Sequence, residues 1–190
     1  MLKIGVIGRS QRDGEVLPAL MLRLAEEVGR HVAGHGAVLV NGGMGGVMEH
    51  SAKGAQLAGG LTVGFLPGSD ARAANPYMDL VFATGMGTLR NVLTARCCDS
   101  IIMIGGGVGS LNEVTIAYDS GVPVVVLEGT TGWSDRLRAT LYDEQFLDER
   151  HVVAVSYASS PEDAVTQAVA RSTESRRAAH LPAYMGWAAQ

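Results

Sequence analysis

The residues most capable of chemistry lie between Ile101 and Glu113, in the stretch IIMIGGGVGSLNE. Four glycines and a serine follow its apolar run: Gly105, Gly106, Gly107, Gly109 and Ser110. Glycines let a backbone approach a ligand closely, and N–H groups at the start of a helix attract an anion. The carboxylate of Glu113 is expected one helical turn further on. A phosphate-binding turn beside a carboxylate predicts a site for a phosphorylated sugar.

Two further glycine-bearing turns follow apolar runs. Gly8-Arg9-Ser10 ends the run Leu2–Ile7, and Asn41-Gly42-Gly43 ends the run Ala37–Val40. In open α/β sheets, ligands bind beyond the carboxyl ends of the parallel strands. We therefore expect all three glycine turns at the same edge of one sheet.

The elements that must position these turns are short apolar runs alternating with segments of helical period. The expected strands are Leu2–Ile7, Ala37–Val40, Leu61–Leu66, Leu80–Ala83, Ile101–Ile104, Val122–Leu127 and Val152–Val155. The expected helices are Glu15–Ala33, Met44–Ala58, Met86–Cys98, Val108–Ser120 and one from about Pro161. Wholly apolar strands that alternate with helices predict an open, doubly wound, Rossmann-like α/β fold with helices on both faces of a mainly parallel sheet.

Length and composition favour one domain. The 190 residues are 47% hydrophobic, and no composition break marks a linker. We expect a nucleotide-binding α/β domain over residues 1–172 and a C-terminal tail over 173–190. The polar loop from Ser69 to Met78 is a candidate rim of the site.

Net charge and cysteine content indicate which partners and which cellular compartment to expect. The net charge of −4 argues against a nucleic-acid partner, because such proteins usually carry a basic surface. The two cysteines, Cys97 and Cys98, are adjacent and have no metal-ligand spacing, so we expect no metal site and a reduced, cytoplasmic setting. No apolar run approaches the length of about 20 residues that a membrane span needs.

Several enzyme classes conflict with the motifs. The turn after the first strand lacks G-x-G-x-x-G, and the second strand ends at Asn41 instead of an acid, which disfavours a nicotinamide dehydrogenase. Neither a P-loop nor a G-x-S-x-G elbow occurs. The only lysines, Lys3 and Lys53, are poor candidates for a pyridoxal-phosphate Schiff base, so we expect no cofactor and no decarboxylase of that kind.

The second and fifth turns together resemble a known family. The segment NGGMGGVM, from Asn41 to Met48, is similar to the GGG-x-x-GLMG motif of LOG-type ("Lonely Guy") proteins. Gly105 to Glu113 is similar to their PGG-x-GT-x-x-E motif, and GTLRN, ending at Asn91, is similar to their M-x-x-RK segment. The resemblance extends over roughly residues 2–127 and indicates a branch close to molybdenum-cofactor carrier proteins.

The resemblance implies an activity and the residues that perform it. Members include phosphoribohydrolases, which cleave nucleoside 5′-monophosphates to a free base and ribose 5-phosphate. Arg90 and Glu113, 23 residues apart, would then be the catalytic pair. The implied phosphate- and nucleotide-binding residues are Gly8, Ser10, Gly42, Gly43, Gly45, Gly46, Asn91, Gly105, Gly106, Gly107, Gly109, Ser110 and Asn112.

Four positions depart from the family pattern. The family's Lys, Pro, Thr and first acid are replaced here by Asn91, Gly105, Ser110 and Asn112. The two asparagines remove one positive and one negative charge from the expected site. The alternative hypothesis is therefore a non-catalytic carrier or sensor for a nucleotide or a pterin-type cofactor. Either protein would bind a nucleoside monophosphate or a related phosphorylated small molecule, and we expect a homo-oligomer such as a dimer.

Overall fold

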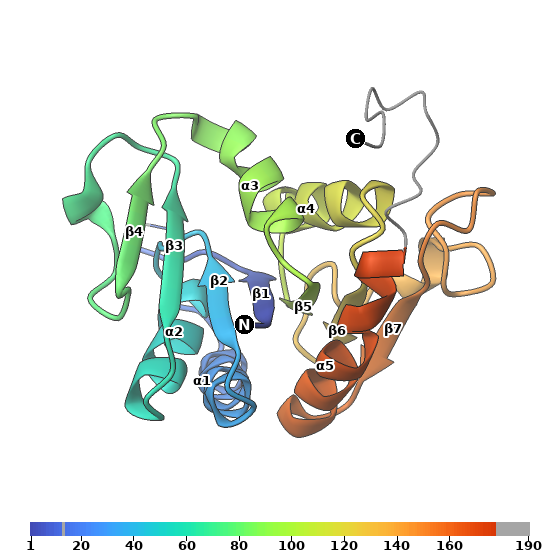
Figure 1. The fold of residues 1–190 in the computed structure, drawn as a ribbon, viewed down its shortest axis with the longest axis horizontal. Coiled ribbons are helices and arrows are strands. Elements are labelled where there is room, and N and C mark those ends of the chain that lie inside the picture. The colour runs from blue at the N-terminus through green and yellow to red at the C-terminus, as the bar shows by residue number, and fades with distance from the viewer. Residues whose placement is uncertain (13, 178–190) are drawn as a thin grey trace.

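The computed structural model describes residues 1–12 and 14–177, and Figure 1 shows their arrangement. Within these residues the strands are β1 (Lys3–Gly8), β2 (Val38–Asn41), β3 (Thr62–Leu66), β4 (Leu80–Ala83), β5 (Ser100–Ile104), β6 (Val124–Leu127) and β7 (Val155–Ala158). The α-helices are α1 (Ala19–Gly34), α2 (Val47–Leu57), α3 (Asn91–Arg96), α4 (Val108–Asp119) and α5 (Pro161–Arg177). A short 3-10 helix, η2 (Gly87–Arg90), leads directly into α3.

The strands form one parallel sheet in the order β4-β3-β2-β1-β5-β6-β7. Helices α1, α2 and α5 cover one face, and α3 and α4 cover the other (Figure 1). This arrangement confirms the predicted doubly wound α/β fold. Beginning at β1, the chain builds the sheet outward in one direction to β4 and then crosses back to place β5 on the other side of β1. The boundary between β1 and β5 is thus the topological switch point of the sheet.

Side chains along each central strand point alternately to the two faces of the sheet, so each strand contributes to both hydrophobic cores. In β5, Ile102 and Ile104 pack with the core under α1, α2 and α5, whereas Ile101 and Met103 pack with the core under α3 and α4. All five residues of β5 are buried. A strand buried on both faces needs apolar side chains at successive positions, which explains the unbroken hydrophobic run in the sequence.

The last strand lies three residues later than the sequence predicts. The prediction of Val152–Val155 is wrong, because β7 pairs with β6 from Val155 to Ala158. Val153 is buried although it lies outside the strand, so its apolar character reflects packing of the preceding loop. Ser156 and Tyr157 are only partly buried at this edge of the sheet, which hides the strand from a search for apolar runs.

Three predicted helices are clearly shorter than expected, and the one predicted over Met44–Ala58 spans only Val47–Leu57. The first starts at Ala19 instead of Glu15, since Pro18 occupies its N-cap position and a proline disfavours helical geometry in the preceding residue. The segment expected as one helix over Met86–Cys98 is divided into η2 and α3 and ends at Arg96. This division turns Arg90, the last residue of η2, toward α4.

The chain's end is only partly described. Helix α5 continues to Arg177, five residues into the predicted tail of 173–190, and residues 178–190 lie outside the described residues. Among the described residues, no helix is both long and apolar enough to span a bilayer. The same residues contain no group of three or more His, Cys, Asp or Glu side chains arranged to hold a metal ion.

Candidate functional site

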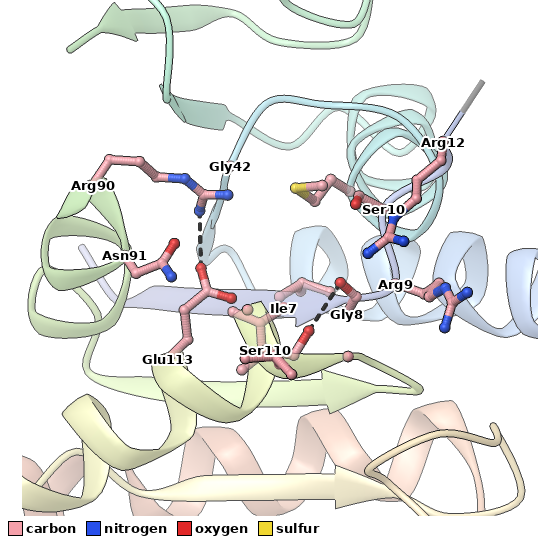
Figure 2. A pocket seen from close by; sticks show the side chains of 15 residues that line it. Ile7, Gly8, Arg9, Ser10, Arg12, Gly42, Arg90, Asn91, Ser110 and Glu113 are labelled. Carbon is pink, nitrogen blue, oxygen red and sulfur yellow. Dashed lines mark hydrogen bonds and ion pairs between the residues drawn. The ribbon is translucent and has the colours of Figure 1, made fainter. Parts of the chain in front are cut away.

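A cavity lies at the switch point of the sheet. It has a volume of about 200 Å³ and opens beyond the carboxyl ends of β1 and β2, against the start of α4 (Figure 2). Its lining includes Gly8, Gly42, Glu113 and the segment from Gly107 to Ser110. The chain order therefore brings the three predicted glycine turns to one edge, as the sequence indicates.

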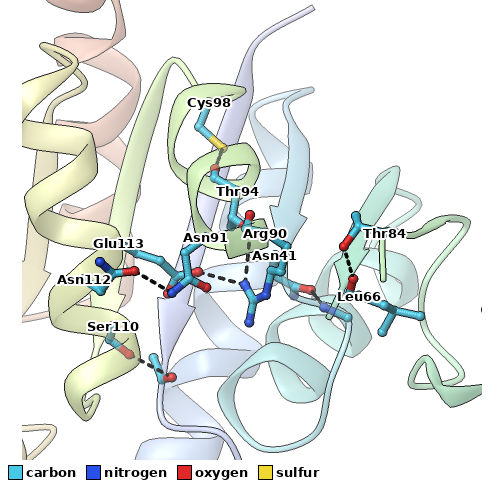
Figure 3. A network of polar contacts seen from close by, with 12 residues as sticks. Asn41, Leu66, Thr84, Arg90, Asn91, Thr94, Cys98, Ser110, Asn112 and Glu113 are labelled. Carbon is cyan, nitrogen blue, oxygen red and sulfur yellow. Dashed lines mark hydrogen bonds and ion pairs between the residues drawn. The ribbon is translucent and has the colours of Figure 1, made fainter. Parts of the chain in front are cut away.

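A buried ion pair forms one end of the cavity. Arg90 Nη1 donates to Glu113 Oε1 at 2.9 Å, and the two side chains are only 13% and 8% exposed (Figure 2). The same Nη1 donates to Thr94 Oγ1 at 3.1 Å, one turn along α3 (Figure 3). Arg90 belongs to η2 and Glu113 to α4, so the pair joins two separate elements through residues that lie 23 positions apart in the sequence.

Burial changes the acidity of Glu113. Desolvation raises the pKa of its carboxyl from 4.5 to about 7, and the positive charge and hydrogen bond of Arg90 oppose this rise. The loss of water around the carboxylate outweighs the attraction of its single cationic partner. A carboxyl group with this pKa exchanges protons readily at neutral pH, which is the property required of a general acid or base.

Gly42 leaves room for the guanidinium of Arg90. A Cβ atom at position 42 would lie 2.6 Å from Arg90 Nη2 and 2.7 Å from Nη1. The absent side chain thus allows the guanidinium to pack on the backbone of the turn after β2. The Arg90 Nε atom is buried and has no hydrogen-bond partner among the described residues. The position of Arg90 therefore depends on Gly42, Thr94 and Glu113 together.

The N-terminus of α4 forms the floor of the cavity. Leu111 N donates to Gly107 O at 3.0 Å in the first turn, and the N–H groups that precede Leu111 have no acceptor within the helix. Ser110 is 4% exposed, and its hydroxyl donates to the Gly8 carbonyl oxygen at 3.0 Å. The hydroxyl thus fastens α4 to the end of β1, and the backbone N–H groups are what the helix presents to an anion.

The structure brings together nine of the fifteen predicted site residues around this cavity. They are Gly8, Ser10, Gly42, Arg90, Asn91, Gly107, Gly109, Ser110 and Glu113. The other six do not line it: Gly43, Gly45, Gly46, Gly105, Gly106 and Asn112. Of the five glycines outside the cavity, Gly46 and Gly105 lie against neighbouring backbone.

Close packing explains why these two positions are glycine. A Cβ at Gly46 would lie 2.5 Å from the Arg9 carbonyl oxygen, which already accepts a hydrogen bond from Val47 N at 3.0 Å. The loop after β1 therefore covers the N-terminus of α2. Gly105 has a φ of +61°, and a Cβ there would lie 2.9 Å from the Thr130 carbonyl oxygen.

The two asparagines that depart from the family pattern contact each other. Asn91 Nδ2 donates to Asn112 Oδ1 at 2.8 Å, and this bond joins the start of α3 to α4 beside the ion pair (Figure 3). Asn91 is 4% exposed and lines the cavity, whereas Asn112 is exposed and does not line it. The resemblance places a cation and an acid at these positions, and here an uncharged amide pair occupies them.

Sequence reasoning missed the charged residues of the first turn. Arg9 and Arg12 line the cavity together with Ser10, and neither arginine was among the predicted binding residues. Two arginines within four residues of a strand end were a usable signal, because guanidinium groups beside a glycine turn are typical of phosphate sites. Met48 of α2 also reaches the cavity.

Comparison with curated proteins finds two informative relatives. An uncharacterized protein of Archaeoglobus fulgidus is 43% identical over 135 residues, covering 68% of this chain and 85% of the relative. The cytokinin riboside 5′-monophosphate phosphoribohydrolase of Mycobacterium tuberculosis is 32% identical over 151 residues, covering 71% of this chain and 80% of the enzyme.

A solved structure and a family model extend the comparison. The molybdenum cofactor binding protein of Rippkaea orientalis superposes with a TM-score of 0.74 at 32% identity, covering 89% of this chain and 96% of that one. The model of the SLOG cluster4 family matches residues 1–165. The chain therefore belongs to the SLOG cluster4 family, a LOG-type family close to the molybdenum-cofactor carriers.

Proposed function

We propose that the protein hydrolyses the N-glycosidic bond of a nucleoside 5′-monophosphate, releasing the free base and ribose 5-phosphate. The observation that carries this proposal is the buried Arg90–Glu113 pair in the same cavity as the N-terminus of α4. The phosphate would lie on the N–H groups at the helix start. Glu113 follows Gly109 by four residues, about 6 Å along the helix axis, a spacing that a ribose bridges between its phosphate and C1′.

The chemistry follows from the charges. Cleavage of the bond between C1′ and the base leaves an oxocarbenium-like ribose, which the Glu113 carboxylate stabilises. The ionised carboxylate also accepts a proton from the attacking water, whose oxygen bonds to C1′. The base departs with the bonding electrons and takes up one proton at its ring nitrogen from solvent. Arg90 holds the carboxylate toward the cavity through their 2.9 Å contact. Similarity to the M. tuberculosis phosphoribohydrolase supports this reaction.

A non-catalytic carrier is the second candidate. It is favoured by the uncharged Asn91–Asn112 pair and by similarity to the R. orientalis molybdenum cofactor binding protein. The cavity of about 200 Å³ is also smaller than most small-molecule sites, which measure about 300–1,000 Å³. A carrier would use the same helix terminus for the phosphate of its cargo without cleaving a glycosidic bond.

Base release separates the two candidates. Purified protein is incubated with the 5′-monophosphates of adenosine, guanosine, cytidine, uridine and N6-prenyl-adenosine, and free base is measured by chromatography. The hydrolase predicts release of at least one base, and Glu113→Gln should slow it by about 100-fold or more. Absence of release, with a nucleotide that still raises the melting temperature, would contradict the hydrolase and favour the carrier.

We also propose that the protein acts as a homo-oligomer without a nucleic-acid partner. Large apolar side chains are exposed on β4 and around α3 and α4, as at Phe82, Leu89 and Val108, which are 51%, 66% and 78% exposed. A second copy would remove this surface from water. Light scattering coupled to size exclusion tests the assembly, and a monomer at micromolar concentration would contradict it.

A further inference from the structure

The loop between β1 and α1 faces the cavity from the side opposite the ion pair. Figure 2 shows Arg90 and Asn91 on one side, and Arg9, Ser10 and Arg12 on the other. The start of α4 lies between the two sides, where Ser110 is tied to Gly8. The cavity therefore has a cationic group at each end and helix N–H groups on its floor.

Glu15 organises this loop. Its carboxylate forms an ion pair with Arg9 and accepts a 3.3 Å hydrogen bond from the backbone N–H of Arg12. Its own N–H donates to the Arg12 carbonyl oxygen at 3.0 Å, and Gln11 Nε2 donates to the Glu15 carbonyl oxygen at 3.1 Å. The bond from Arg9 lowers the pKa of the Glu15 carboxyl, so Glu15 is ionised and fixes Arg9 at neutral pH.

The arginines around the cavity therefore differ in whether a carboxylate neutralises them. Arg90 is paired with Glu113, and Arg9 is paired with Glu15. The guanidinium of Arg12 makes no ion pair or hydrogen bond within residues 1–12 and 14–177. Its charge contributes only through space to the lowered pKa of the Glu15 carboxyl, and the residue lines the cavity. An unpaired guanidinium that faces helix N–H groups across a cavity complements a dianionic phosphate, because both donate to its oxygens.

We propose that Arg12, supported by Arg9, binds the 5′-phosphate against the N-terminus of α4 and selects phosphorylated ligands over unphosphorylated ones. This inference rests on the proposed function for the presence of a sugar phosphate and names the residues that recognise it. Arg12 acts in binding alone, since the reacting C1′ would lie toward Glu113 at the other end of the cavity. Arg12 is also exposed, so its removal leaves the core intact.

The test compares ligands that differ only in their phosphate. Calorimetry measures the Kd of ribose 5-phosphate against ribose, and of AMP against adenosine, in the wild type and in Arg12→Ala and Arg12→Lys. Arg12→Ala should raise the Kd of both phosphorylated ligands by about 10- to 100-fold, the effect of one charge-assisted hydrogen bond. The affinities for ribose and adenosine should not change. Arg12→Lys should give intermediate values, because it keeps the charge and loses the planar fork.

The matched control is Arg23→Ala, which removes an exposed arginine from α1 outside the cavity. The proposal is overturned if Arg12→Ala leaves the Kd of both phosphorylated ligands unchanged, or raises the Kd of AMP and of adenosine by the same factor. It is also overturned if the wild type binds neither ribose 5-phosphate nor AMP. Arg12-dependent binding of AMP, with no base released from any of the five nucleotides tested above, would refute the hydrolase and leave the phosphate recognition standing.

Discussion

Replacement of Glu113 by glutamine should change how stability depends on pH. In the folded protein, burial raises the pKa of this carboxyl from 4.5 to about 7. Each pKa unit corresponds to about 1.36 kcal/mol. Ionisation of this carboxyl therefore costs about 3 kcal/mol more in the folded protein than in the unfolded chain. The residue is only 6% exposed, so solvent screening reduces this value little.

The direction of this pH dependence follows from the number of protons that the folded and unfolded chains bind. Below pH 4.5 the group is protonated in both the folded and the unfolded chain, so it has no pH-dependent effect. Between pH 4.5 and about 7 the unfolded chain loses its proton while the folded chain keeps it. The free energy of unfolding therefore falls as pH rises through this window, and the loss is complete above about pH 7.

Glutamine does not titrate and keeps an oxygen that accepts the Arg90 hydrogen bond. The stability of Glu113→Gln relative to the wild type should therefore increase by about 3 kcal/mol between about pH 4.5 and pH 8. For a chain of this size, that is a change of about 6–12 °C in the difference between the two melting temperatures. Urea unfolding and scanning calorimetry at several pH values measure it.

A matched variant isolates the effect of burial. Glu27→Gln removes an exposed carboxylate from α1, and it should leave the pH dependence of stability close to that of the wild type. If the difference between Glu113→Gln and the wild type is constant across this pH range, Glu113 has no raised pKa. The assignment of Glu113 as a proton-transfer group at neutral pH would then lose its physical basis.

Substitutions at two further positions test the residues that hold Arg90 and Asn91 in place. Gly42→Ala should reduce base release or ligand affinity at least tenfold in the assays above, because its Cβ would lie 2.6 Å from Arg90 Nη2 and displace the guanidinium; Gly68→Ala, whose Cβ would meet no atom within 4 Å, should change neither quantity. Asn112→Leu should lower the free energy of unfolding in urea by about 1–3 kcal/mol by leaving the buried amide of Asn91 without its acceptor. Asn112→Asp keeps an acceptor and should stay within about 1 kcal/mol of the wild type; an equal loss in both Asn112 variants would show that this hydrogen bond is not the cause.

Most of the fold could be predicted from local patterns. Residues 101–104 are apolar at every position, as burial on both faces of a parallel sheet requires, and the glycine turn after them ends the strand. Edge elements were harder to predict. Strand β7 contains Ser156 and Tyr157, which are partly exposed, so its start cannot be read from hydrophobicity alone.

The site was predictable only in outline. The two motifs that contain Arg90 and Glu113 identify the pair, since the residue types and their separation are properties of the sequence. Their 2.9 Å contact depends on η2 turning Arg90 toward α4, and the sequence predicted an uninterrupted helix there. Likewise, Asn91 and Asn112 are visible as two separate departures from a motif, but only the fold makes them hydrogen-bond partners.

The sequence by itself determined the alternation of strands and helices, the three glycine turns and the residue types available for chemistry, because these follow from local periodicity and backbone freedom. The tertiary structure alone decided which glycines face the cavity and which pack against backbone, as Gly42 and Gly46 illustrate. It also decided that Arg12 lines the same cavity as the start of α4, and that burial raises the pKa of Glu113. Packing, desolvation and charge pairing depend on distances between segments far apart in the chain, and those distances exist only once the chain has folded.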